Sequence, residues 1–402
     1  MRRRISRTSP SAPAAEGPLR VLLVCHYYPP HVGGIENVVH DEAVRLAELG
    51  HQVTVLTSGE RTSVVEEVDD DGNTVRVVRI AAWNISERRT GVPFPLLSPR
   101  LLPRVLRWAR WADVVHIHDC FYLTSWAAGF ASAIARVPTV LTQHVAMVEH
   151  PSGLVMAGQK LVYGTMGRVL LRRAATVFTI NEYIARFVGT LGAAPAKVVV
   201  LGNGVDGRLF RPAADEAERR RLRERFGLPA DRILALFVGR LVPKKGIDLV
   251  LGAVESEDAA FDLVAVGSGD AGLLEGRERV HFLGQQPTRM VAEIYRACDL
   301  FVLPTTGEVF PLVVKEAMSA GLPVVTTDEP DYARYGLDPE GVALVRREPD
   351  AVRRALAAIA GDDALRERMG SYAMQYAAKQ FSWSEHMTTL VHHYRSAGAE
   401  RR

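Results

Sequence analysis

The stretch VLLVCHYYPPHVGGIENVVHDEAVRLAELGHQVTVLTS, at positions 21–58, decides the fold class of this 402-residue chain. It begins with a short apolar run and continues through a loop rich in proline and glycine. A segment with apolar residues at helical spacing follows and ends on Gly50, and a second apolar run comes directly after it. This order predicts a strand, a loop, a helix and a strand, the repeating unit of a parallel sheet that helices cover on both faces.

The same alternation recurs along the chain in two series. The first continues with ADVVHIHD and VPTVLTQH, and the second contains ILALFVGR, FDLVAVGSG, VHFLG, CDLFVLP and LPVVTT. We therefore predict an α/β protein with two facing Rossmann-like, doubly wound parallel sheets. Ligands of such sheets bind outside the carboxyl ends of the strands, so a cleft between the two domains is the expected site.

The predicted boundaries follow from changes in composition. A strand gives way to glycine, asparagine and proline in KVVVLGNGVDGRLFRP, which marks a hinge. We expect a disordered basic tail at 1–17, an N-terminal domain at 18–203, the hinge at 204–214, a C-terminal domain at 215–380, and a helix at 381–402 that crosses back to the N-terminal domain.

Composition excludes several classes of function. The formal net charge of +3 comes without a long basic tract, so we expect no nucleic-acid partner, whereas an anionic substrate or an acidic membrane surface would suit it. Cys25, Cys120 and Cys298 lack metal-ligand spacing and indicate a reducing, cytoplasmic environment. No signal peptide and no uninterrupted apolar stretch of about 18 residues is present, so a spanning helix is not expected.

The segment TTGEVFPLVVKEAMSAGLPVV, at 305–325, carries the main chemical signal. Pro311 suits the first turn of a helix that runs to about Ala320, which places Glu308 on the preceding loop and Glu316 inside the helix. A helix start attracts phosphate, and a carboxylate further in can accept two hydrogen bonds from a ribose diol. Standing alone, the two glutamates would about equally well be solvated surface carboxylates.

The E-x7-E spacing of this segment resembles the signature of family four of the retaining glycosyltransferases, which have the GT-B fold, and the resemblance extends over most of the chain. It implies that Glu308 faces the donor sugar as a catalytic residue, that Glu316 holds the ribose, and that Leu312 and Val313 line the donor pocket. The segment reads EVFP where the family usually has EGFG. Because Val309 enters positive φ less freely than glycine and Pro311 removes a backbone donor, the sugar is not identified.

Two cations follow a predicted strand in VGRLVPKKG. Arg240 and Lys245 lie on one loop, where they can neutralise a diphosphate and stabilise it as a leaving group. The loop resembles the family's G-R-x4-K-G element, which assigns both residues to the donor phosphates. A solvated loop is the alternative. We expect no cofactor and no metal, since Asp69–Asp71 are followed by Gly-Asn and indicate a hairpin turn.

A glycine pair separates the first strand from its helix. Gly33 and Gly34 would let a phosphate approach the backbone, although a tight turn without a ligand has the same pattern. The form GG-x-E resembles the family's loop that closes over the donor phosphates, so we include both glycines in the donor site.

His118 ends the predicted strand in DVVHIHD, and His116 precedes it on the same face. Histidines in half-buried strands are mostly structural, and we interpret His116 in that way. The resemblance implies a catalytic role for His118 near the transferred sugar, and an acceptor-side position for His144 at the end of VPTVLTQH.

Three further positions complete the expected donor pocket. Asn203 resembles the family's hinge motif, although an ordinary Asn-Gly turn fits nearly as well. Phe282 and Gly284 resemble the strand end whose backbone reads the base. Gly267 and Gly269 lack the third glycine of a dinucleotide fingerprint, and we interpret them as a loop.

Two segments could lie on an anionic membrane. Residues 98–111 place Arg100, Arg104 and Arg107 at helical spacing between apolar residues, and residues 156–174 form a long helical stretch that includes two arginines near its end. Amphipathic helices with solvated arginines are the alternative. The pattern leaves the oligomeric state open.

The sequence thus predicts an enzyme that moves a hexose from a nucleotide diphosphate sugar, UDP before GDP, to a hydroxyl of a glycan, lipid-linked or small-molecule acceptor, with retention of configuration and without a metal. A GT-B-type sugar-nucleotide epimerase would share the fold and the phosphate site but would not need E-x7-E. A catalytically silent subunit would be expected to lack the cationic pair or Glu316. An oxidoreductase is disfavoured because no complete G-x-G-x-x-G is found.

Overall fold

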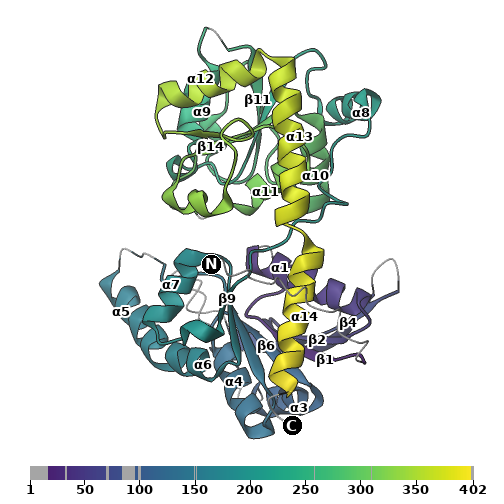
Figure 1. Cartoon of the computed structure of the whole chain (residues 1–402), viewed down its shortest axis with the longest axis vertical. Helices are drawn as coiled ribbons and strands as arrows, with labels where there is room; N and C mark the ends of the chain where they lie inside the picture. The colour runs from purple at the N-terminus through teal and green to yellow at the C-terminus, as the bar shows by residue number, and fades with distance from the viewer. Residues whose placement is uncertain are drawn as a thin grey trace, which may run out of the picture. The chain divides into compact units, whose positions relative to one another are not determined.

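The computed structural model describes residues 17–31, 34–68, 72–83, 96–97, 101–148, 150, 152–257, 259–308 and 310–399. The predictions for most of the tail, for Gly33, Asp69–Asp71 and Val309, and for Arg100 concern residues outside these ranges. The chain divides into two compact units (Figure 1). The first contains Met1–Ile180, Ile184–Val200 and Leu390–Arg402, and the second contains Asn181–Tyr183 and Leu201–Thr389.

The first unit is built on a nine-stranded sheet with the order β3-β4-β2-β1-β6-β7-β8-β9, to which β5 adds beside β4. β3 and β5 are antiparallel to β4, and the other neighbours are parallel. Their bounds are β1 Arg20–Val24, β2 Gln52–Gly59, β3 Ser63–Val68, β4 Thr74–Trp83, β5 Leu96–Leu97, β6 Val114–His118, β7 Thr139–Gln143, β8 Thr176–Thr179 and β9 Val198–Val200.

The central strands of this sheet are apolar on both faces because helices cover both. Val21, Leu22, Leu23 and Val24 are fully buried in β1. Figure 1 shows α1 and α4 among the helices that flank the sheet. The helices are α1 Gly34–Glu48, α3 Leu101–Trp111, α4 Leu123–Ala135, α5 Gly153–Val162, α6 Arg168–Arg173 and α7 Glu182–Thr190, with a π-helical turn at Tyr163–Gly167 between α5 and α6.

The second unit has a six-stranded, fully parallel sheet with the order β12-β11-β10-β13-β14-β15. The strands are β10 Ile233–Val238, β11 Phe261–Val266, β12 Val280–Phe282, β13 Leu300–Leu303, β14 Val324–Thr327 and β15 Ala343–Val345. The helices are α8 Glu216–Phe226, α9 Ile247–Val254, α10 Thr288–Ala297, α11 Leu312–Ser319, α12 Pro349–Ala360, α13 Asp363–Gln380 and α14 Trp383–Ala399. The two sheets confirm the predicted α/β fold.

The last helix, α14, belongs to both units, because the residues from Leu390 onward are part of the first unit. Tyr394 is 1% exposed there, and its hydroxyl lies 2.7 Å from Nδ1 of His116. Nδ1 of His393 lies 3.2 Å from the hydroxyl of Thr176. The second half of α14 therefore packs against the first sheet.

Each sheet has a point where the strand order reverses. It lies between β1 and β6 in the first unit and between β10 and β13 in the second. Connections leave such neighbouring strands in opposite directions, so a crevice opens at their carboxyl ends, and this is where open α/β sheets bind ligands. The residues that follow these four strands are therefore the first candidates for function.

Within the part of the chain that the structure describes, no helix is both long and apolar enough to cross a membrane.

Candidate functional site

In the second unit, the loops that follow β10 and β13 bring charged residues together. Arg240 follows β10 and is exposed, while Lys245 and Glu308 form an ion pair with 2.5 Å between Nζ and Oε1. The hydroxyl of Thr305 donates to the other carboxylate oxygen of Glu308 at 3.1 Å. The family resemblance implies a phosphate role for Lys245 and a sugar role for Glu308, and the structure places the two side chains in direct contact. Thr305 was not predicted.

Gly246 lets the Lys245 turn lie against the end of β13. Its φ is 77°, and a Cβ at this position would come within 2.3 Å of the carbonyl oxygen of Pro304. A side chain there would therefore both strain the backbone and push the two loops apart. The contact between Lys245 and Glu308 depends on this close approach.

Helix α11 begins beside Glu308. Pro311 is its N-cap with ψ of 145°, so the helix starts at Leu312, one residue later than predicted. Among the described residues, the backbone N–H groups of Leu312 and Val313 have no acceptor. They point out of the positive end of a helix, which is an arrangement that binds anions.

Glu316 lies in α11 and is 9% exposed. The Tyr295 hydroxyl, which comes from α10, lies 3.2 Å from its Oε2 and 2.9 Å from the carbonyl oxygen of Val313. Burial, reinforced by the charge of Glu316, raises the pKa of Tyr295 well above its ordinary value, so this hydroxyl keeps its proton and can donate. Tyr295 was missed because nothing in its local sequence distinguishes it from a core aromatic residue.

Phe310 holds the loop between Glu308 and α11. It is 2% exposed, has a φ of 54°, and packs against Tyr332, Tyr335 and Phe381. A positive φ is strained for a residue other than glycine, and the buried ring is what keeps it there. Phe310, which matches the family pattern, and Pro311, which departs from it, thus fix the start of α11.

Three other predicted donor residues, Phe282, Gly284 and Asn203, also lie in the second unit. Phe282 ends β12, and Gly284, with a φ of 67°, accepts a hydrogen bond from the N–H of Gly267 at 2.9 Å. The carbonyl of Asn203 accepts from Nζ of Lys315, next to Glu316, at 3.2 Å.

In the first unit, histidines gather at the carboxyl edge of the sheet. His118 ends β6 and His144 follows β7, with 3.1 Å between Nδ1 of His118 and Nε2 of His144. His26 follows β1 and stacks on Tyr122 with ring centroids 4.3 Å apart. Burial lowers the pKa of His26 to about 3, so it is neutral near pH 7. His26 was not predicted.

Gly34 is the first residue of α1, where the sequence placed the phosphate loop. Glu36 of the same helix pairs with His31, with 3.1 Å between Oε1 and Nδ1. Further along α1, the buried carboxylate of Glu42 lies 3.5 Å from Nε2 of His118 and 3.6 Å from Nδ1 of His116. Glu42 belongs to no motif recognised in the sequence.

Asp119 fixes the turn that follows His118. It has a φ of 67°, is fully buried, and accepts from the side-chain amide of Gln143. Burial raises its pKa to about 8, so the carboxyl group is mostly protonated at neutral pH. Because Gln143 immediately precedes His144, this contact ties the ends of β6 and β7 together.

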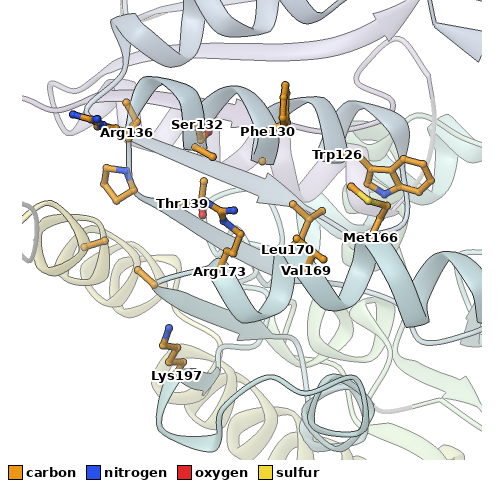
Figure 2. Close-up of a pocket in the computed structure, with 16 residues that line it drawn as sticks. Trp126, Phe130, Ser132, Arg136, Thr139, Met166, Val169, Leu170, Arg173 and Lys197 are labelled. Atoms are coloured by element: carbon orange, nitrogen blue, oxygen red, sulfur yellow. The ribbon is translucent and has the colours of Figure 1, made fainter.

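A separate pocket of about 420 Å³ lies at the opposite edge of the first sheet. Figure 2 shows Trp126 and Met166 at one end of it, with Arg136 and Lys197 toward the other. Thr139 begins β7 and Lys197 precedes β9, so the pocket is at the amino ends of the strands. It contains none of the predicted site residues, and we assign the chemistry to the carboxyl edge.

Comparison with known families matches both halves of the chain. Residues 33–204 match the family described as "Glycosyl transferase 4-like domain", and residues 218–376 match "Glycosyl transferases group 1".

Curated relatives and solved structures agree with these matches. A D-inositol 3-phosphate glycosyltransferase from Xylanimonas cellulosilytica is 29% identical, over 97% of this chain and 99% of the relative. Sucrose-phosphate synthase from Thermosynechococcus elongatus is similar in structure, with a TM-score of 0.70, 21% identity and coverage of 95% and 100%. HepE from Anabaena, solved with UDP, has a TM-score of 0.72, 19% identity and coverage of 94% and 100%.

The relatives named here are glycosyltransferases by name or by fold, and the epimerase alternative finds no support among them. One assignment follows from the order of the two sheets, from the polar loops at their reversal points and from the matches over both halves. The chain belongs to the family-four glycosyltransferases with the GT-B fold.

Proposed function

We propose that this glycosyltransferase transfers a hexose from a nucleotide diphosphate sugar, with UDP as the first choice of nucleotide and GDP as the second, to an acceptor hydroxyl with retention of configuration. The observation that supports the donor class is that Arg240, Lys245 and the first N–H groups of α11 lie on loops at one reversal point. Such a set offers two cations and a positive helix end to a diphosphate.

The ribose has a matching partner in Glu316. Its carboxylate lies inside α11, on the helix whose N-terminus would receive the phosphates. The Tyr295 hydroxyl orients the carboxylate by its contact with Oε2. The carboxylate can still accept hydrogen bonds from a ribose diol. The structures of HepE with UDP and with UDP-glucose concern a distant relative and favour UDP as the first nucleotide to test.

The proposed reaction breaks the bond between the anomeric carbon and the diphosphate oxygen and forms one to the acceptor oxygen on the same face. The electron pair leaves with the diphosphate, and the acceptor proton passes to the departing phosphate oxygen. Arg240 and Lys245 stabilise the negative charge that develops there, a role that a metal ion has in other transferases. Glu308 faces the sugar, and its ion pair with Lys245 links the sugar and phosphate subsites.

The acceptor belongs to the first unit in this proposal. We expect His118 to act on the transferred sugar and His144 to contact the acceptor; both lie at the carboxyl edge of the first sheet. The acceptor classes are a glycan, a lipid-linked acceptor and a small molecule. The relative named for D-inositol 3-phosphate makes a phosphorylated polyol the first to assay.

The experiment that tests the donor is a thermal-shift panel of UDP, GDP, ADP and TDP sugars. A ligand that binds only the native state at 100 times its Kd stabilises it by about 2.7 kcal/mol, and we expect UDP or GDP sugars alone to raise Tm in this way. Lys245→Met should abolish the shift, whereas Lys244→Met on the same turn should keep it. A panel without any shift, or a shift that survives Lys245→Met, would reject the donor site.

Product analysis tests the mechanism separately. We expect NMR of the product to show the anomeric configuration of the donor, and activity to persist in EDTA. Inversion would contradict the retaining mechanism, and inactivation by EDTA that Mg²⁺ reverses would contradict metal independence.

We also propose a peripheral contact with an anionic membrane, which would place the enzyme at the inner face of the cytoplasmic membrane. Of the two candidate segments, α3 buries its apolar face, since Leu101, Val105 and Ala109 are in the core. Around the second segment, α5 instead exposes Leu154 and Leu161, and α6 exposes Val169. Exposed basic residues accompany them, namely Lys160, Arg168, Arg172 and Arg173. This combination is typical of helices that lie on anionic lipid.

A further inference from the structure

The buried carboxylate of Glu42 is an unexpected group in the first unit. Glu42 is 1% exposed, and its Oε2 lies 3.5 Å from Nε2 of His118 and 3.6 Å from Nδ1 of His116. A buried carboxylate is costly unless a positive or hydrogen-bonding group faces it. Its position next to the proposed catalytic histidine indicates that it does more than fill the core.

The contacts of His118 determine where its hydrogen lies. Nδ1 of His118 and Nε2 of His144 are both ring nitrogens and are 3.1 Å apart, so a single hydrogen lies between them. Nε2 of His118 faces the Glu42 oxygen, and a lone pair there would repel the carboxylate. Whether His144 donates to a neutral His118 or a protonated His118 donates to His144, Nε2 of His118 carries a hydrogen.

The same residues have the spacing of a metal site, because one ligand atom each from Glu42, His116 and His118 lie within 4.8 Å of one another. Both ring nitrogens of His116 are engaged, however, at 2.7 Å from the Tyr394 hydroxyl and at 2.7 Å from the Thr142 hydroxyl. A histidine ligand must direct a lone pair at the metal. Because the observed contacts occupy both ring nitrogens of His116, it has no lone pair to direct at a metal. The cluster is therefore better explained by a hydrogen between Glu42 and His118 than by a metal ion.

We propose that Glu42 is a positioning residue that holds the hydrogen on Nε2 of His118 and thereby orients the His118–His144 pair. Its part resembles that of the buried aspartate that orients histidine in a Ser-His-Asp triad. Asp119 also lies next to the pair, but it is directed at Gln143. The effect on turnover rests on the proposed function, whereas the position of the hydrogen does not.

Histidine NMR of the full chain tests the position of the hydrogen directly. Selective ¹⁵N-histidine labelling, with the His118 signal assigned by its loss in His118→Asn, should show the Nε2–H tautomer in the wild type. Glu42→Leu, which removes the carboxylate that faces Nε2, should lose this preference, and Glu42→Gln, which retains an oxygen there, should keep it. Glu48→Gln, at the exposed end of the same helix, should match the wild type. Circular dichroism and Tm identify any variant that fails to fold.

Turnover gives the second readout. Glu42→Leu should lower kcat about 10- to 100-fold with an unchanged KM for the donor, and Glu42→Gln should restore most of it. The proposal would be overturned if Nε2 of His118 carried no hydrogen in the wild type. It would also be overturned if Glu42→Leu left the tautomer of His118 unchanged. A histidine spectrum that changes when a chelator is added would overturn it in favour of a metal. A normal tautomer result in a protein without transferase activity would reject the proposed function alone.

Discussion

At the scale of single residues, Glu316 provides the sharpest test of the donor site. Two charge-assisted hydrogen bonds to a ribose contribute about 1.5–3 kcal/mol each, and the cost of ordering and desolvating the groups reduces this gain. We therefore expect Glu316→Ala to weaken nucleotide binding by at least about tenfold. Tyr295→Phe should weaken it less, because it removes only the group that orients the carboxylate. Calorimetric titration with the best nucleotide measures both.

The matched control for this prediction is Glu224→Ala, on the exposed face of α8. It removes a glutamate from the same unit without touching the site. Wild-type affinity in Glu316→Ala would mean that another residue holds the ribose.

Asp119 gives a prediction about pH. Its pKa in the folded protein is about 8, above the value of about 4 for an unfolded aspartate, so the folded state keeps a proton that the unfolded state releases between these values. The contribution of this group to stability is therefore fully present below pH 4 and is lost as pH rises through 8. Asp119→Asn keeps the acceptor for Gln143 and tolerates the positive φ.

We accordingly expect Asp119→Asn to have a higher Tm than the wild type at pH 8–9 and a similar Tm near pH 4. The comparison of the two proteins cancels the opposite trend from His26, whose lowered pKa makes the fold lose stability toward acid. A Tm difference that is constant with pH would show that folding does not raise the pKa of Asp119.

Motif residues could be found from the sequence, and their partners could not. Lys245, Glu308 and Glu316 belong to short motifs. The spacing of these motifs can be recognised in the sequence without knowledge of the fold. Tyr295 and Glu42 look like ordinary residues of amphipathic helices, and only the packing of α10 on α11 and of α1 on β6 brings them to the site. The signal would have been the burial of a polar group on a helix, and burial depends on the fold.

At the scale of elements, the turn that carries Lys245 can be tested with two glycines of the same segment. Gly246 has positive φ and would place a Cβ 2.3 Å from the Pro304 carbonyl oxygen, whereas Gly252 lies inside α9 with nothing within 4 Å. We expect Gly246→Ala to destabilise the protein by at least about 1 kcal/mol and Gly252→Ala to stabilise it by about 0.5–1 kcal/mol. Urea denaturation of both variants measures the difference.

The sign of the two effects is the informative quantity, since both changes add one methyl group. Equal effects would show that the close approach of the Lys245 turn to β13 is not required. The fold itself was predictable at this scale, because apolar runs and helical spacing locate strands and helices. The start of α11 was misplaced by one residue, because Pro311 caps the helix instead of entering it.

At the scale of the whole molecule, the exposed face of α5 and α6 predicts where the enzyme meets lipid. Leu154 and Leu161 are 83% and 67% exposed, and their spacing of seven residues places them on one side of α5. Insertion of a leucine side chain contributes about 1.5–3 kcal/mol, and each nearby arginine or lysine adds about 1 kcal/mol at an anionic surface. Two leucines with several basic residues are therefore sufficient for reversible binding.

We expect the enzyme to float with vesicles that contain phosphatidylglycerol, to remain behind with purely zwitterionic vesicles, and to dissociate at high salt, because screening weakens the basic contribution. Leu154→Ser with Leu161→Ser should reduce binding about 10- to 100-fold. Leu102→Ser, on α3, is the matched control, since it removes an exposed leucine from a helix whose apolar face is already buried. If Leu102→Ser abolishes binding while the α5 double variant still binds, the membrane contact lies on α3. If the wild type does not float with any vesicles, the protein has no such membrane contact.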